Sequence, residues 1–479
     1  MATVSAAAAL RALPGPPLSP VVGTTLQFVR GVVDGLRENK PFGFIREWHN
    51  QYGPVVRIDS IGLGKCVLLG DPELVKYVAR NDPARFTKGG YDAIKRGWLD
   101  GSLVVSEGEV WRRKRDAYNR AFKLGAIRSY APLFMEIANN AAENWQHAYE
   151  QNETVDAVKC FEGVALEAIG QAGFGLKGLG APGNRYAAAF TKYTELLNEE
   201  VSSLSLRLLP PKVSSWITSR RGRPYLQEMR SESLRIVNEA SAVAAHGAGN
   251  AASESTRRNL VALMREACAE AGVEELDAEQ LACEANLFLF AGHDTTSASL
   301  AFTFAMLGSH PEVQQRVYEE IAAIPADALL SELSDPRKLP YLGAVIKETL
   351  RLYPPASMVI RTSKFDEEIR GHHVPAGINY VPSIWAIQRD PIVFEAADEF
   401  RPERWQDTSG EQLKRMQDHW MPFMIGARGC IGQQFSLMEM RTVLATLLRR
   451  FRAELVSEPK VVQRMLLLPE NISLRCTPR

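Results

Sequence analysis

Several features that would narrow the class of protein at once are missing from this chain of 479 residues. No stretch reaches about 18 consecutive apolar residues, so the sequence predicts no transmembrane helix. Net charge is absent as well, because 56 basic side chains balance 56 acidic ones, which argues against a general nucleic-acid binder. Cysteine is scarce, without a C-x-x-C pair, so neither a disulfide framework nor a zinc site is indicated and a reducing environment is expected. The six cysteines are Cys66, Cys160, Cys268, Cys283, Cys430 and Cys476.

A linker-like stretch is also missing after residue 40, and we predict one large domain over residues 39–479. Residues 13–38 are interpreted as a hinge and N-terminal segment, because the motif Leu13-Pro14-Gly15-Pro16-Pro17 is stiff and non-helical. Residues 1–12 are too short and too small to span a bilayer, and we interpret them as a remnant of a leader or an anchor.

Helical periodicity dominates the rest of the chain, and the prediction is a mainly α fold with small β-sheets near both ends. Helices are predicted over residues 72–80, 108–122, 126–149, 155–174, 184–203, 224–246, 257–271, 278–308, 311–323, 340–353 and 431–451. Strands are predicted over residues 55–61, 65–69, 358–362 and 380–383, with a strand pair over 465–475.

The most informative segment runs from Phe423 to Gly432 and reads F-x-x-G-x-R-x-C-x-G. Glycines such as Gly426 and Gly432 let a backbone turn freely and approach a ligand closely. Arg428 offers a planar fork of donors to a carboxylate. The helix predicted after Cys430 favours a negative sulfur at its N-terminus. This setting suits a thiolate that lies against a flat, anionic macrocycle.

The segment resembles the haem-binding loop of the cytochrome P-450 superfamily, the haem-thiolate monooxygenases. The resemblance implies haem b held by Cys430 as the axial metal ligand, between a long distal helix and the Cys loop with its proximal helix. Thiolate ligation pushes electron density onto iron and favours O–O cleavage. Phe423, Gly426, Arg428 and Gly432 are implied to line the cofactor.

A second motif, Ala291-Gly292-His293-Asp294-Thr295-Thr296, resembles the oxygen-activation helix of the same superfamily. Gly292 and Thr295 predict a local distortion of a long apolar helix. The resemblance assigns Thr295 to the bound dioxygen or its water and Asp294 to the proton-delivery route. His293 is predicted to be packed or partly exposed on the opposite flank of the helix. Ala291 stands where a fatty-acid ω-hydroxylase branch carries an ester-linked glutamate, so that bond to haem cannot form.

A supporting frame is implied by two further motifs. Glu348 and Arg351 lie one helical turn apart before a helix-stopping Pro354-Pro355, and Arg404 lies in a P-E-R-W segment. By resemblance these three form a buried triad that holds the Cys430 loop.

Haem carries two carboxylates, so buried cations are expected around it. Trp111 and Arg115 resemble the propionate-binding W-x-x-x-R helix of the superfamily. Arg361 and Arg428 are the further propionate partners that the resemblance implies.

The substrate is predicted to be lipophilic, because the segments that set specificity in the superfamily carry apolar side chains here and no charged clamp. A fatty acid, a terpenoid or carotenoid, and a sterol stay open. The candidate wall residues are Trp98, Leu99, Phe288, Phe290, Ala291, Met358, Val359 and Leu468.

Electrons must come from a separate flavin reductase or ferredoxin, with NADPH acting only indirectly, because no flavin or nicotinamide domain is apparent. Two surface segments could contact a partner or a membrane, and each has two interpretations. Arg112, Arg113 and Lys114 with Lys414 and Arg415 form either a basic docking patch or ordinary solvated charge. The apolar stretch 204–221 with basic flanks forms either a peripheral membrane contact or a buried connection.

The sequence therefore predicts a monooxygenase that inserts one atom of O2 into a lipophilic substrate. It resembles eukaryotic membrane-associated members, which places it on the cytosolic face of the endoplasmic reticulum with the anchor absent from this chain; the plastid stays open. One rival is a haem-thiolate hydroperoxide isomerase or dehydratase, and another is a non-catalytic haem binder. The intact Asp294–Thr295 pair argues against the first, and the lack of an output domain argues against the second.

Overall fold

A computed structural model gives the architecture of the chain. It describes residues 10–19, 23–60, 64–89, 99–120, 122–202, 211–246, 260–270, 277–325, 328, 332–333, 335 and 337–479. Among these residues, the helices include none with the length and apolar character that crossing a bilayer requires.

Helices make up most of the described structure, as predicted. They are α2 (Thr25–Arg37), α3 (Gly43–Tyr52), α4 (Pro72–Asn81), α6 (Gly108–Tyr118), α7 (Leu124–Arg128), α8 (Ala131–Glu150), α9 (Ala157–Phe174), α10 (Arg185–Ser202), α12 (Pro211–His246), α14 (Leu260–Glu270), α15 (Ala278–Ser309), α16 (Pro311–Ala322), α18 (Pro340–Leu352), α19 (Ile384–Ile387), α20 (Arg404–Asp407), α21 (Gly410–His419) and α22 (Gln433–Arg450).

The strands form small separate sheets. They are β1 (Val55–Ser60), β2 (Gly64–Leu69), β3 (Phe86–Thr87), β4 (Val155–Asp156), β5 (Arg361–Ser363), β6 (Glu367–Ile369), β7 (His372–Val374), β8 (Asn379–Pro382), β9 (Phe451–Leu455), β10 (Lys460–Gln463), β11 (Leu467–Glu470) and β12 (Ser473–Pro478). A five-stranded sheet has the order β1-β2-β8-β5-β3, in which only β2 and β8 run parallel. The order β4-β12-β9 makes a second sheet, and β6-β7 and β10-β11 are two-stranded.

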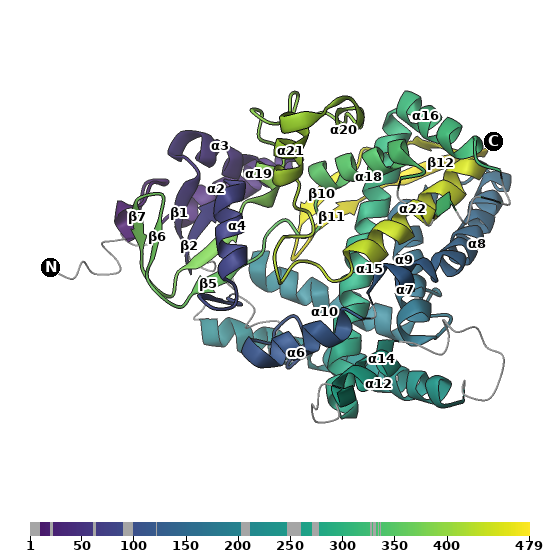
Figure 1. The fold of residues 1–479 in the computed structure, drawn as a ribbon, viewed down its shortest axis with the longest axis horizontal. Coiled ribbons are helices and arrows are strands. Elements are labelled where there is room, and N and C mark those ends of the chain that lie inside the picture. The colour runs from purple at the N-terminus through teal and green to yellow at the C-terminus, as the bar shows by residue number, and fades with distance from the viewer. Residues whose placement is uncertain are drawn as a thin grey trace.

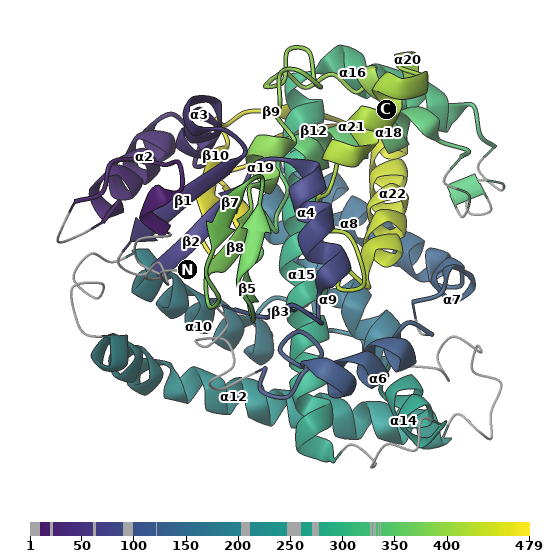
Figure 2. The same cartoon turned by 60° about the vertical axis from the view of Figure 1, so that its left-hand side comes forward.

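Helix α15 occupies the middle of the molecule (Figure 2), with the five-stranded sheet on one side and α22 on the other. The sheet and the first helices gather at one end of the molecule, and the remaining helices fill the other end (Figure 1). The largest apolar cluster packs α8, α9, α15 and α22 together. Two smaller clusters cover the faces of the five-stranded sheet, so each layer buries its apolar side chains against a neighbour.

Three predicted helix boundaries are wrong. The helix predicted over 108–122 ends at Tyr118. A proline lies at each of the other two. The helix predicted over 126–149 is split into α7 and α8, because Pro132 has no backbone N–H and is tolerated only in the first turn of α8. The helix predicted from residue 224 begins at Pro211, and α12 carries Pro224 in its interior. Helices α2, α3, α19, α20 and α21 and the short strands β3, β4, β6, β7, β9 and β10 were not predicted.

Candidate active site

A cavity of about 290 Å³ lies between α15, α6 and the loop that leads into α22. Cys430 of that loop opens into it, as do Ala291 and Thr295 of α15 and Trp111 and Arg115 of α6. Apolar side chains make most of its wall, and the charged groups gather on one side of the lining. The chain thus places one sulfur, several cations and an apolar helix face around a single space.

The loop before Cys430 needs its glycine at position 426. Met424 and Gly426 have backbone φ angles of 55° and 79°, and a Cβ atom on Gly426 would lie 2.9 Å from the carbonyl oxygen of Ala79. The turn closes when the N–H of Cys430 donates to the carbonyl of Phe423 at 2.9 Å. The strained turn and the close contact with α4 therefore fix where the sulfur points.

The Cys430 sulfur sits at the N-terminus of α22, open to the cavity and enclosed by protein. Burial raises the pKa of its thiol, while the backbone N–H groups of Gly432 and Gln433 and the charge of Arg115 act in the opposite direction. Arg115 also donates from Nη1 to the carbonyl of Gly429 at 2.8 Å. The local field is therefore arranged to favour a thiolate once a cation binds it.

The predicted cations lie together and share two carboxylates that sequence analysis missed. Arg428 donates to Asp82 at 3.1 Å and to Glu107 at 2.8 Å, and its guanidinium lies 4.2 Å from the ring centroid of Trp111. Arg361 donates to the other oxygen of Asp82. Both arginine side chains and Asp82 are almost fully buried. Asp82 thus joins the strand β5 to the Cys430 loop.

Lys88 is a further cavity cation that sequence analysis missed. Its backbone N–H donates to Glu107 at 2.5 Å, and its side chain lines the cavity beside Arg361 and Arg428. Burial and these two positive charges lower the pKa of Lys88 to about 7, against the opposing charges of Asp82 and Glu107. Lys88 lies in no motif, so only its buried position beside these charged groups in the fold reveals it.

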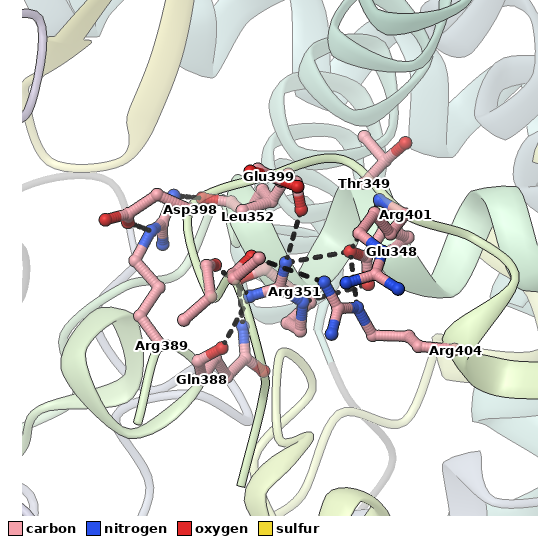
Figure 3. Close-up of polar contacts among 12 residues, drawn as sticks. Glu348, Thr349, Arg351, Leu352, Gln388, Arg389, Asp398, Glu399, Arg401 and Arg404 are labelled. Atoms are coloured by element: carbon pink, nitrogen blue, oxygen red, sulfur yellow. Dashed lines mark hydrogen bonds and ion pairs between the residues drawn. The ribbon is translucent and has the colours of Figure 1, made fainter. Parts of the chain in front are cut away.

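The Glu348 carboxylate is completely surrounded by donors (Figure 3). Arg351 donates to both of its oxygens, at 2.8 and 2.9 Å, and Arg404 donates to one at 3.0 Å. The Trp405 indole at 2.9 Å and the backbone N–H of Arg401 at 3.0 Å complete the shell. Burial raises the pKa of Glu348, but the hydrogen bonds and charges of the two arginines outweigh it, so its pKa is lowered.

Gln388 carries this network to the Cys430 loop. Its carbonyl accepts from Arg351 at 3.0 Å, and its side-chain oxygen accepts from the backbone N–H of Met421 at 2.8 Å. Its amide nitrogen caps the end of α18 at the carbonyls of Leu350 and Arg351. The three predicted triad residues therefore lie together. Gln388, which belongs to no predicted motif, connects Arg351 to the segment before the Cys430 loop.

Helix α15 is continuous through the segment where a distortion was predicted. Gly292 serves close packing instead, because a Cβ atom there would lie 3.1 Å from Ile169 of α9. The Thr295 hydroxyl donates back to the carbonyl of Ala291 at 2.7 Å and faces the cavity. His293, predicted to be packed or partly exposed, is buried and pairs with Asp294 at 2.8 Å between Nδ1 and Oδ1.

Comparison with known proteins agrees with these features. The family model described as Cytochrome P450 matches residues 13–475. The chain belongs to the cytochrome P450 family. It is 30% identical to Cytochrome P450 monooxygenase 91 of Postia placenta, over 93% of this chain and 88% of that protein. It is 28% identical to Cytochrome P450 4d2 of Drosophila melanogaster (98% and 94%) and 25% identical to Cytochrome P450 3A6 of Oryctolagus cuniculus (96% and 90%).

Membership makes the protein an oxidoreductase of the monooxygenase type, with the mainly α fold of the P450 family. The family implies haem with a cysteine thiolate ligand. Identities of 25–30% leave the substrate open, because side chains that line a pocket change more readily than those that build the frame.

The candidate wall residues of this P450 divide into two groups. Phe288, Ala291 and Val359 line the cavity. Leu99, Phe290, Met358 and Leu468 are not among its lining residues, and Trp98 lies outside the described residues.

Packing explains the four side chains that do not line the cavity. Leu99 is buried in the main core, Phe290 packs on Phe190, and Met358 packs against the sheet. Leu468 follows Leu467, which is fully buried, so alternation along β11 turns it to the other face.

The basic residues of α6, for which a docking patch and ordinary solvated charge are both open, differ in their surroundings. Lys114 turns inward, where its ammonium contacts the buried carboxylate of Glu284 at 2.8 Å. Arg112 and Arg113 are exposed but share Glu109. The pairing with Glu109 reduces the net positive charge that α6 offers to a partner.

Proposed function

We propose that this P450 binds haem b in the cavity through the Cys430 thiolate and inserts one atom of O2 into a lipophilic substrate. The observation that carries the proposal is the Cys430 sulfur, open to an apolar cavity at the N-terminus of α22. The N-terminal end of a helix and the charge of Arg115 favour an anionic sulfur there. Bound haem would supply the oxygen-activating chemistry.

The charges around the cavity fit such a cofactor. Lys88, Arg115, Arg361 and Arg428 are four cations, while Asp82 and Glu107 are two carboxylates. The excess of two formal positive charges equals the charge of two propionates, which would relieve a buried imbalance. Trp111 adds an indole donor at the same side of the cavity.

The other residues would position the reaction. The Thr295 hydroxyl, at the cavity wall, would hold water or a proton near the reacting centre, and Asp294 beside it would supply protons. Glu348, Arg351 and Arg404 would keep the Cys430 loop in place without touching the substrate. The intact Thr295 hydroxyl at the cavity favours oxygen activation over hydroperoxide rearrangement.

The substrate would be an apolar molecule, because Phe288, Leu287, Ile169 and Val359 line the space. The four cations of the lining would be taken up by the haem propionates and the two carboxylates rather than by the substrate. Fatty acids, terpenoids or carotenoids, and sterols fit this chemistry. With alanine at position 291, a covalent ester between that position and haem is ruled out, so the cofactor would be held by the thiolate and the propionate partners alone.

Electrons would come from a separate flavin reductase or ferredoxin that draws on NADPH. Exposed Lys414 and Arg415 on α21, with Arg112 and Arg113 on α6, offer it positive charge. A peripheral membrane contact, at the endoplasmic reticulum or in a plastid, would use exposed apolar side chains. These include Leu26 and Leu36 on α2 and Val213 and Trp216 on α12.

The reduced carbon-monoxide difference spectrum tests the proposal. We expect the strongly red-shifted Soret band of thiolate-ligated haem in the parent protein and in Cys283→Ala, whose half-buried cysteine also lies in a helix beside the cavity region. Cys430→Ala should lose that band and all turnover. A parent protein without the band, or a Cys430→Ala variant that keeps it, would overturn the ligand assignment. Product formed with a hydroperoxide but not with a reductase and O2 would favour the rearrangement enzyme.

A further inference from the structure

A second polar cluster lies behind the cavity, where α9 and α10 pack on α15. His293 is buried, with 8% of its side chain exposed, and its Nδ1 pairs with Asp294 at 2.8 Å. Successive residues on a helix normally point apart, so the two side chains have turned toward one another. Thr295 lines the cavity and Asp294 does not. The carboxylate is therefore held on the far side of the hydroxyl that it would serve.

Glu162 of α9 reaches this cluster from the surface. Its side chain is exposed, and its charge acts on the buried imidazole. Burial lowers the pKa of His293, but Asp294 and then Glu162 outweigh that effect, so its pKa is raised. Burial and the nearby Asp294 and Asp156 raise the pKa of Glu162, while His293 and Lys159 oppose the shift. An exposed carboxyl group can exchange protons with bulk water, and its raised pKa favours the protonated form that donates onward.

Tyr186 of α10 adds a buried polar group to the cluster. Its ring is 2% exposed, and its hydroxyl has no hydrogen-bond partner within the part of the chain that the structure describes. Asp294 is the charged group that acts on it. Buried hydroxyls are nearly always hydrogen-bonded, so a donor left open beside a carboxylate marks a place where water or a turned Asp294 is accommodated.

We propose that Glu162 and His293 form the surface end of the route that delivers protons to Asp294 and Thr295. The inference rests on the proposed function. A proton from bulk water binds the Glu162 carboxylate and passes, through one water, to Nε2 of the imidazole. The imidazole releases its Nδ1 proton to Oδ1 of Asp294 across the 2.8 Å contact. One N–H bond forms as another breaks, Glu162 returns to the carboxylate, and no electron moves. His293 acts through Asp294 and is a positioning residue.

Two substitutions test the route without changing side-chain size: Glu162→Gln and His293→Gln. We expect each to slow oxygen-dependent turnover by about tenfold or more, to flatten its pH profile between about pH 6 and 9, and to raise the solvent deuterium isotope effect. The double variant should be no slower than the slower single variant, because both groups serve one route. The control is Glu136→Gln, which should match the parent. Glu136 is an exposed carboxylate on α8 that pairs with Lys177.

A second readout does not depend on turnover. Nuclear magnetic resonance of nitrogen-labelled histidine in the diamagnetic carbon-monoxide form should show the pKa of His293 falling in Glu162→Gln. An unchanged His293 pKa together with parental pH and isotope profiles in both variants would overturn the route. A missing thiolate band in the parent would instead overturn the proposed function, and the coupling of Glu162 to His293 would still be measured.

Discussion

Two buried acid–base clusters lie on opposite sides of the cavity. One, around Glu348, is fully paired and structural, whereas the other, around Asp294, is proposed to transfer protons. Glu348 is fully buried, and both oxygens are saturated by arginine, indole and backbone donors. Within the described residues, Asp294 has one ion-pair partner and keeps 18% of its side chain exposed, and its charge acts on Tyr186, whose hydroxyl has no hydrogen-bond partner there. Moving any group at Glu348 would leave a buried charge unpaired, which is prohibitive. Asp294 can exchange partners at low cost, as proton transfer requires.

The largest effect is expected for Glu348→Gln, which removes the structural carboxylate of the first cluster. Removing this charge leaves Arg351 and Arg404 uncompensated in the interior, and we expect a loss of about 3–5 kcal/mol in the free energy of unfolding, with weak haem retention. Urea unfolding followed by circular dichroism measures it. Glu109→Gln is the matched control, since Glu109 also pairs with two arginines but is exposed, and little change is expected. Equal losses in the two variants would show that burial does not distinguish these networks.

On the opposite side of the cavity, Thr295→Val should leave stability nearly intact and damage chemistry. The methyl group replaces a hydroxyl that faces the cavity, so oxygen consumption should continue while product per electron falls about tenfold and hydrogen peroxide rises. Thr303→Val is the control, because Thr303 makes the same bond to its own helix, at 2.7 Å to Ser299, but lies outside the cavity lining. Similar uncoupling in both variants would assign the effect to the helix rather than to the Thr295 hydroxyl.

Lys88 differs from both clusters, because it is a buried cation whose own charge depends on pH. Because its pKa is about 7, Lys88 of the apoprotein loses its positive charge as the pH rises above neutrality. A bound propionate would favour the charged form, so haem binding above that pH would be accompanied by protonation of Lys88. Haem affinity should therefore fall above about pH 7, and Lys88→Met should speed haem transfer to apomyoglobin about tenfold and remove that pH dependence. Lys88→Arg should behave like the parent at low pH and stay pH-independent. Parental transfer rates in Lys88→Met would mean that the other cations suffice.

The sequence predicted the parts of this site that depend on spacing along one element. The long helix α15, the turn at Gly426 and the pair Glu348–Arg351 follow from periodicity, glycine and a one-turn spacing. The partners from distant segments were out of reach: Asp82 lies 346 residues from Arg428, and Gln388 reaches Met421 across a loop. No local pattern encodes such contacts, because they depend on how the sheet end and the Cys430 loop pack.

Amphipathic surface elements were also hard to predict, for a related reason. Helices α2 and α21 are short and bury few side chains, so tertiary contacts rather than their own apolar stripe decide that they form. Short strands such as β3 and β6 depend on a partner strand in the same way. The mainly α class, the motif-bearing helices and α4, which ends next to Asp82, could be predicted, whereas the short strand β3 before Lys88 could not.

The smallest predicted effect tests whether the His293–Asp294 pair is charged in the native state. The pKa of His293 is raised above its ordinary value of 6.5, so the pair contributes its full stability below that value and loses it as the pH rises through the raised pKa. His293→Gln should therefore be less stable than the parent by about 1 kcal/mol under mildly acidic conditions, and the gap should close in alkali. Urea unfolding of both proteins at several pH values measures the gap, and subtracting the two curves removes the titration of every shared group. A gap that stays constant or widens with pH would mean that His293 is neutral throughout, and that the two clusters differ in packing alone.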